Sequence, residues 1–251
     1  MATEAEVRAR IAAVPHWYHR IELLPGVVTP GVTDSAEYLA FLGLPRDCSG
    51  LRVLDLGTRD GYYAFAFERM GAEVLAVDYL AAEETGFAVC ADVLGSRVEY
   101  LQANIYELTP QRLGSFDVVL FLGLLYHLPD PLGAIHIVRS LTRGQAFLET
   151  QILDNAVLLP DGSFGTLAGI SRELVGMPLM QFYPGRSLAD DPTNYWAPNV
   201  ACVIGMLEEC NFAVEAQEVR GSRAIFRCRG VEDARKEHFI RVARGQERPR
   251  F

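Results

Sequence analysis

The stretch Val53-Leu54-Asp55-Leu56-Gly57-Thr58-Arg59-Asp60-Gly61 decides the fold prediction. Its apolar residues predict a buried strand, and Gly57 and Gly61 predict a tight turn into a helix. A glycine at position 57 lets the backbone pass close to a ligand, because a Cβ there would collide with it. The spacing is GxxxG, whereas a dinucleotide site needs GxGxxG and a P-loop needs a Lys-Ser/Thr pair. The turn therefore favours a ligand without a pyrophosphate.

Short apolar runs alternate with amphipathic stretches around this turn. We expect strands over 51–56, 73–77, 97–101, 116–122 and 145–150, and helices over 61–70, 80–94 and 131–141. A helix over 197–210 and an antiparallel pair over 212–219 and 222–228 follow. This alternation predicts an α/β fold with a doubly wound, mostly parallel sheet. Residues 1–50 form an expected N-terminal cap. Residues 151–198 form an expected insertion after the fifth strand, where so long a loop usually binds a ligand.

Composition narrows the class of protein. The 251 residues are 50% hydrophobic and 22% charged, which is typical of a soluble globular chain. No apolar run approaches the roughly 20 residues of a membrane helix, and the first ten residues hold no apolar signal core, so we expect a cytoplasmic protein without a membrane partner. The five cysteines are widely spaced and lack CxxC, which excludes a disulfide framework and a zinc ribbon. No metal site is expected.

Charge is distributed unevenly along the chain. The net charge is −9, yet residues 220–251 hold ten basic residues against four acidic ones. Residues 1–219 therefore carry a net charge of −15. So acidic a region is a poor general binder of nucleic acid, because the phosphates need basic contacts. The basic end is either a local nucleic-acid contact or a solvated terminal segment. We therefore expect a catalytic domain over 51–228 and a basic tail over 229–251.

Polar side chains at neighbouring strand ends extend the candidate site. Asp78 closes the second strand, where a carboxylate can accept both hydroxyls of a ribose. Asn104 follows the third strand, where its amide could read an adenine edge. Each residue taken alone is also explained as a helix cap or a turn residue. The candidate cofactor-binding residues are Asp55, Gly57, Thr58, Gly61, Asp78, Tyr79, Asn104, Ile105, Leu122 and Tyr126.

A nucleoside site without a pyrophosphate resembles that of the class I S-adenosylmethionine-dependent methyltransferases. Their first motif reads approximately E/D-x-G-x-G-x-G, and residues 55–61 keep its acid and its first and last glycines, with Arg59 at the middle glycine. The resemblance implies a Rossmann-like, seven-stranded sheet, S-adenosylmethionine as donor and S-adenosylhomocysteine as product. It also implies that Asp55 and Gly57 lie by the methionine moiety and that Asp78 binds the ribose.

A second motif, Gly123-Leu124-Leu125-Tyr126-His127-Leu128-Pro129-Asp130-Pro131, follows the fourth strand. Tyr126 could present its π face or hydroxyl to a sulfonium. His127 could take a proton from an attacking oxygen or nitrogen, or it could only shape the turn. With Leu148-Glu149-Thr150 and Leu158-Leu159-Pro160, this motif resembles the tRNA wobble-uridine carboxymethyltransferases and their relatives of unassigned substrate.

That narrower resemblance implies a donor with an extra carboxylate, held by Tyr126 and Arg223. The family's lysine before the first strand has no counterpart, because Lys236 is the only lysine. His19 or Arg20 could replace it. The family's long N-terminal RNA-contacting region is also missing. These departures favour ordinary S-adenosylmethionine and a small acceptor, with an RNA methyl- or carboxymethyltransferase as the alternative.

The acceptor is expected under the segment 16–30 and the insertion 151–198, which supply aromatic walls and arginines for an acidic group. The aromatic residues could equally form a hydrophobic cap over the sheet. The candidate substrate-binding residues are Trp17, Tyr18, Arg20, Arg186, Tyr195, Trp196 and Arg223. The candidate catalytic residues are His127, Tyr126 and His19. The predicted activity is methyl transfer to an oxygen or nitrogen of a small molecule.

Overall fold

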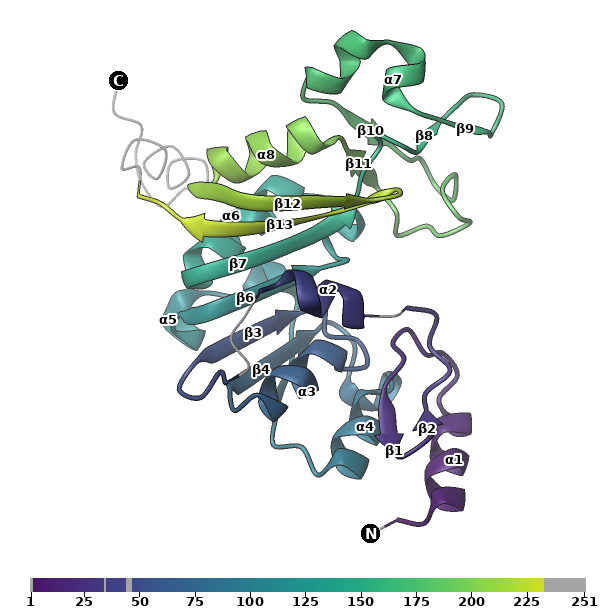
Figure 1. Ribbon diagram of the computed structural model, residues 1–251, viewed down its shortest axis with the longest axis vertical. Coiled ribbons are helices and arrows are strands. Elements are labelled where there is room, and N and C mark those ends of the chain that lie inside the picture. The colour runs from purple at the N-terminus through teal and green to yellow at the C-terminus, as the bar shows by residue number, and fades with distance from the viewer. Residues whose placement is uncertain (1, 34, 44–46, 233–251) are drawn as a thin grey trace. The chain divides into compact units, whose positions relative to one another are not determined.

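The computed structural model describes residues 2–33, 35–43 and 47–232 (Figure 1). They divide into two compact units. The first runs to Leu122 and includes Leu141–Arg143; the second contains Gly123–Ser140 and the described residues from Gly144 onward. The expected division into cap, catalytic domain and tail stays a prediction, and most of that tail, 233–251, lies outside the described residues. None of the described helices is long and apolar enough to cross a membrane.

Seven strands form the main sheet, in the order β12-β13-β7-β6-β3-β4-β5. In the first unit β6, β3, β4 and β5 pair in parallel. In the second, β13 pairs antiparallel with both β7 and β12. The expected Rossmann-like α/β fold with a mostly parallel, seven-stranded sheet is confirmed. The strands are β3 (Arg52–Leu56), β4 (Glu73–Asp78), β5 (Glu99–Gln102), β6 (Phe116–Leu122), β7 (Thr142–Gln151), β12 (Phe212–Arg220) and β13 (Arg223–Gly230).

The first unit has its core along β3 and β6, whose central residues are buried because apolar side chains point from both faces of each strand. The expected helix over 80–94 is instead two elements, η1 (Ala82–Glu84) and α4 (Phe87–Leu94). The break lies at Thr85, whose backbone is extended and whose hydroxyl accepts the N–H of Phe87. The other helices here are α3 (Tyr62–Arg69), η2 (Ile105–Glu107) and α5 (Pro110–Leu113).

The N-terminal segment packs on α4 through α1 (Glu4–Ala13) and β1 (Glu22–Leu24) (Figure 1). Trp17 is buried, and its indole N–H donates to the carbonyl of Ile11. A Cβ at Gly86 would overlap this indole, so Trp17 fills the space that the glycine leaves. The segment also contains β2 (Val27–Val28), and α2 (Ala36–Phe41) follows it. Trp17 thus has a packing role in this unit.

The second unit contains η3 (Leu125–His127), α6 (Pro131–Leu141, whose last residue belongs to the first unit) and α8 (Val200–Glu209). The insertion was expected to be loop-like, yet it holds short elements and a core of its own around Leu153, Leu167, Tyr183, Leu188 and Ala197. Its elements are β8 (Val157–Leu158), β9 (Phe164–Gly165), α7 (Leu167–Ile170), η4 (Arg172–Gly176), β10 (Met180–Phe182) and β11 (Trp196–Pro198).

Candidate functional site

The turn after β3 is a left-handed backbone corner. Gly57, Arg59 and Gly61 all have positive φ angles, of 71°, 53° and 89°. The N–H groups of Gly57 and Thr58 donate to the carbonyl of Val77, at 2.8 and 3.1 Å, which joins the turn to β4. Glycine adopts such angles freely, whereas an arginine at φ 53° is strained by about 1–2 kcal/mol. Other contacts must therefore hold the corner in place.

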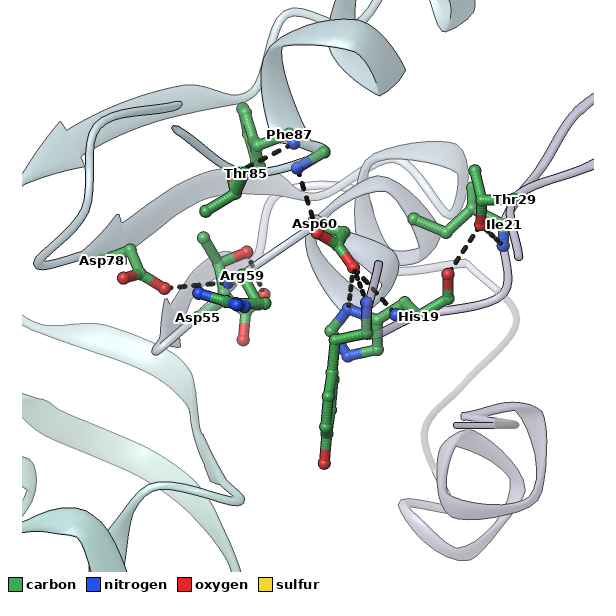
Figure 2. A network of polar contacts seen from close by, with 12 residues as sticks. His19, Ile21, Thr29, Asp55, Arg59, Asp60, Asp78, Thr85 and Phe87 are labelled. Carbon is green, nitrogen blue, oxygen red and sulfur yellow. Dashed lines mark hydrogen bonds and ion pairs between the residues drawn. The ribbon is translucent and has the colours of Figure 1, made fainter. Parts of the chain in front are cut away.

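Asp78, the last residue of β4, supplies one of these contacts (Figure 2). Its Oδ2 atom accepts the N–H of Arg59 at 3.0 Å, and its Oδ1 atom accepts the N–H of Leu80 at 3.1 Å. An ionised carboxylate offers about four acceptor positions, so both oxygens can still accept a hydroxyl. Asp78 therefore fits a ribose and at the same time fixes the glycine turn beside it.

Asp55 organises the same corner from inside the fold. Its carboxyl group is buried and accepts the hydroxyl proton of Thr58, whose oxygen lies 2.7 Å from Oδ2. Burial raises the pKa of Asp55 to about 7, against the lowering effect of the Thr58 hydroxyl. The carboxyl group thus holds the turn through Thr58. The predicted contact of Asp55 with a methionine moiety stays a prediction.

Asp60 is a residue of this site that sequence reasoning missed (Figure 2). It is fully buried and accepts three backbone N–H groups. Oδ2 accepts those of Tyr18 at 2.7 Å and His19 at 2.8 Å, and Oδ1 accepts that of Gly86 at 3.0 Å. One carboxylate therefore joins the N-terminal segment, the glycine turn and the start of α4. In the sequence, its position directly before Gly61 is the one feature that could have marked Asp60 as part of the site.

His19 is placed by this anchor. Its ring centroid lies 5.0 Å from that of Tyr18 and 6.0 Å from those of Tyr62 and Tyr63. Its Nδ1 atom is buried 3.9 Å from Asp60 Oδ2 and has no hydrogen-bond partner among the described residues. Burial lowers the pKa of His19 to about 4, although the charge of Asp60 opposes this. The imidazole is therefore neutral at pH 7.

The other predicted cofactor residues of this unit lie outside the glycine turn and differ in their exposure to solvent. Tyr79 is 66% exposed. Asn104 caps η2, because its side-chain oxygen accepts the N–H of Tyr106, which leaves its NH₂ group for an adenine edge. Ile105 is buried and Leu122 is partly buried. The structure thus gathers Asp55, Gly57, Thr58, Gly61 and Asp78 at one corner, and the contacts of all these residues with a cofactor stay predictions.

The second unit contains the turn of Tyr126 and His127, called here the Tyr-His turn, and a partly buried ion pair. Arg223 on β13 donates to Glu149 on β7 through two bonds, Nε to Oε1 at 2.6 Å and Nη2 to Oε2 at 2.7 Å. Its Cζ atom lies 4.7 Å from the ring centroid of Tyr126. Burial opposes the charge, yet Glu149 and Tyr126 keep the pKa of Arg223 above its ordinary value. The residues that the narrower resemblance assigns to a donor carboxylate are therefore neighbours.

The end of the insertion is bonded to the same turn. The N–H of Tyr195 donates to the carbonyl of Tyr126 at 2.8 Å, and the indole N–H of Trp196 donates to that of Leu128 at 3.1 Å. His127 Nδ1 lies 3.1 Å from the carbonyl oxygen of Thr193 and 2.9 Å from its hydroxyl. Tyr195 and Trp196 thus shape the Tyr-His turn from outside it.

The remaining predicted acceptor residues are described within their own units. Arg186 is an exposed residue that pairs with Asp190 in the insertion, at 2.8 Å. Tyr18 is partly buried beside His19, and Arg20 is exposed. The contacts of these residues with an acceptor stay predictions.

Curated proteins with related sequences are methyltransferases. The ubiquinone biosynthesis O-methyltransferase of Xanthomonas campestris pv. campestris is 38% identical over 104 residues, which are 40% of this chain and 43% of that protein. The protein of the same description from Xanthomonas euvesicatoria pv. vesicatoria is 34% identical over 115 residues, 45% and 48% of the two chains. The chain thus matches less than half the length of these relatives.

Solved structures share the fold. The N-terminal domain of EvdMO1 with bound S-adenosylhomocysteine has a TM-score of 0.62 and 20% identity, over 93% of this chain and 98% of that one. The 1,6-didemethyltoxoflavin-N1-methyltransferase of Burkholderia thailandensis has a TM-score of 0.53 and 19% identity, over 79% and 76%. The family model described as a methyltransferase domain matches residues 33–193, more than half of the chain. The chain therefore belongs to the methyltransferase-domain family, and its class I fold agrees with that membership.

Proposed function

We propose that this chain is an S-adenosylmethionine-dependent methyltransferase that transfers a methyl group to an oxygen or nitrogen of a small-molecule acceptor. The observation that carries the proposal is the corner after β3, where Gly57 and Arg59 have positive φ angles and Asp78 closes the next strand. The relatives named above, an O-methyltransferase of ubiquinone biosynthesis and a 1,6-didemethyltoxoflavin-N1-methyltransferase, support the same reaction class.

The residues present fit this donor. Asp78 would accept the ribose hydroxyls with the lone pairs that the N–H groups of Arg59 and Leu80 leave unused. The backbone of Gly57, which has a positive φ angle, would lie along the amino-acid part of the donor. S-adenosylmethionine supplies an already activated methyl group on a positively charged sulfur. The protein therefore needs only to align the acceptor, exclude water and, for a hydroxyl or protonated amine, remove a proton.

Two histidines are candidates for proton removal. His19 in the first unit is a neutral imidazole at pH 7, because burial lowers its pKa to about 4. Such a low pKa makes it a weak acceptor of protons, so it suits an acceptor whose own proton is acidic. His127 in the second unit is partly exposed and is held by Thr193. His127 is the better candidate for a hydroxyl or amine acceptor.

Calorimetric titration with S-adenosylhomocysteine tests the donor site. The wild-type protein should bind it, and Asp78→Asn should weaken binding at least tenfold, because the charged acceptor for two hydroxyls is lost, at about 1.5–3 kcal/mol for each bond to a charged group. Asp92→Asn, a change at an exposed carboxylate of α4, is the matched control and should bind normally. Absence of binding by the wild-type protein at millimolar ligand would refute the proposal.

One observation favours a second candidate, carboxymethyl transfer to tRNA. Arg223 lies against Tyr126, the pair that the narrower resemblance assigns to a donor carboxylate. A second observation speaks against this candidate. Glu149 already accepts from two of the three nitrogens of the Arg223 guanidinium, so the carboxylate of such a donor would be repelled by the charge of Glu149. Competition between S-adenosylmethionine and its carboxylated form separates the two candidates. Preference for the carboxylated donor, with retention of tRNA at low salt, would favour the second.

A further inference from the structure

The segment at the end of the insertion forms a chain of hydrogen bonds that reaches the ring of His127. Thr193 donates its backbone N–H and its hydroxyl proton to Asp191 Oδ1, at 2.8 and 2.6 Å. On its other side, Thr193 meets His127 Nδ1 with both its hydroxyl oxygen and its carbonyl oxygen, at 2.9 and 3.1 Å. The order of the chain is therefore carboxylate, hydroxyl, imidazole.

The chemistry of these atoms fixes where the proton of His127 resides. A backbone carbonyl only accepts hydrogen bonds, so Nδ1 must donate to the carbonyl of Thr193. The hydroxyl proton of Thr193 points to Asp191, so its oxygen also accepts from Nδ1. In a neutral imidazole only one nitrogen carries a proton. The lone pair of His127 is therefore on Nε2.

We propose that Thr193 and Asp191 are positioning residues that hold His127 in the tautomer whose Nε2 accepts a proton. The base role of His127 rests on the proposed function, whereas its tautomer is a property of the folded chain. A histidine base oriented by hydrogen bonds on its second nitrogen is a recurring catalytic arrangement. Here the orienting groups come from the insertion and the histidine comes from the turn after β6.

Neighbouring hydrogen bonds and charges support this chain of bonds. Hydrogen bonds from Tyr195 to the carbonyl of Tyr126 and from Trp196 to that of Leu128 fasten the insertion to the turn near His127. Partial burial raises the pKa of Asp191, but the hydrogen bonds from Thr193 and the positive charge of Arg186, joined by that of His127 once it is protonated, hold the pKa below its ordinary value. Asp191 is therefore a carboxylate at neutral pH, and it stabilises positive charge on the ring after proton uptake.

Nitrogen NMR of the full-length protein, with ¹⁵N-labelled histidine, reads the tautomer directly. The His127→Gln variant assigns the resonances. The wild-type ring should show a protonated Nδ1 and an unprotonated Nε2. Thr193→Val keeps the backbone carbonyl but removes the hydroxyl acceptor and its link to Asp191, so the fraction protonated at Nδ1 should fall without vanishing. Thr193→Ser, which keeps the hydroxyl, should retain the wild-type signals. A wild-type ring protonated at Nε2, or unchanged signals in Thr193→Val, would overturn the proposal.

Kinetics provide the second readout. Thr193→Val and Asp191→Asn should each lower kcat at least tenfold and change the acceptor KM less than twofold, because the orientation of a base affects the chemical step. Asp190→Asn is the matched control, since this neighbouring acid pairs with the exposed Arg186, and its kcat should equal that of the wild type. A rise in KM with unchanged kcat would contradict a positioning role.

The donor-binding experiment and the tautomer experiment have independent outcomes. A protein that binds no S-adenosylhomocysteine would refute the proposed function, while the histidine resonances would still report the tautomer. A protein that transfers methyl groups with His127 protonated at Nε2 would refute this inference alone.

Discussion

Replacing Asp60 with asparagine should loosen the N-terminal segment from the glycine turn. The carboxylate of Asp60 accepts the N–H groups of Tyr18, His19 and Gly86 in a fully buried position. Asparagine keeps one accepting oxygen, which can serve Tyr18 and His19. Its NH₂ group then faces the N–H of Gly86, donor against donor. The opposite rotamer leaves two N–H groups without an acceptor and is less favourable.

The magnitude follows from these bonds. A hydrogen bond to a charged acceptor contributes about 1.5–3 kcal/mol, and a buried N–H left without an acceptor costs about 1–3 kcal/mol. One lost bond and two weakened ones make a loss of roughly 3–4 kcal/mol in the free energy of unfolding. For a chain of this size, each kcal/mol lowers Tm by about 2–4 °C, so Tm should fall by roughly 10 °C.

Urea denaturation and native-state hydrogen exchange measure this effect. The amides of Tyr18, His19 and Gly86 should lose protection first, because the substitution acts on their hydrogen bonds. Asp92→Asn is the control, since Asp92 forms an exposed ion pair with Arg10 and should cost less than about 1 kcal/mol. A loss for Asp60→Asn no larger than that control, with unchanged protection of the three amides, would refute the anchoring role.

Three further predictions concern packing and charge. Gly86→Ala should lower the free energy of unfolding by about 1–3 kcal/mol in urea denaturation, because the added Cβ would overlap the buried indole of Trp17. Gly205→Ala, which has open space around it in α8, should raise that free energy by up to about 1 kcal/mol. Equal effects of the two substitutions would contradict this packing. Burial raises the pKa of Asp55 from its ordinary value of 3.8 to about 7, so the folded state holds the extra proton and stability falls as pH rises through that interval. Asp55→Asn should remove that part of the slope, and an unchanged pH profile would disprove the shift. Glu149→Gln should cost about 1.5–3 kcal/mol in thermal unfolding, because Arg223 loses its charged partner and keeps only a neutral amide oxygen at position 149; a loss below about 1 kcal/mol would exclude a tight ion pair.

The main sheet was predictable because its strands are short apolar runs between turns. Residues 116–122 were expected as a strand and form β6 over the same residues. The position of the Asp78 carboxylate beside the turn after β3 was also predictable, because the carboxyl ends of adjacent parallel strands lie at one edge of a sheet. The break before α4 was not, because it depends on a hydroxyl cap at Thr85 and on the contact of Gly86 with Trp17.

The contacts of the candidate sites were predictable only in part, because they join residues far apart in the chain. Asp60 bonds to backbone N–H groups, which any residue other than proline offers, so no side-chain pattern marks its partners. Thr193 meets His127 across 66 positions, and Arg223 meets Glu149 across 74. Local periodicity carries no information about such pairings. The pairing of Arg223 with Glu149 was accordingly beyond sequence reasoning, although Arg223 itself was chosen as a candidate.

The separate apolar core of the insertion has a consequence for engineering. Since Leu153, Leu167 and Tyr183 pack among themselves and their neighbours, the folding of this segment depends on few side chains. Its exposed positions, such as Phe164 and Met177, are then free to vary without weakening that core. A library randomised at these outward positions should retain folded protein in most members. The insertion is therefore the practical place to diversify this protein while the corner after β3 is left unchanged.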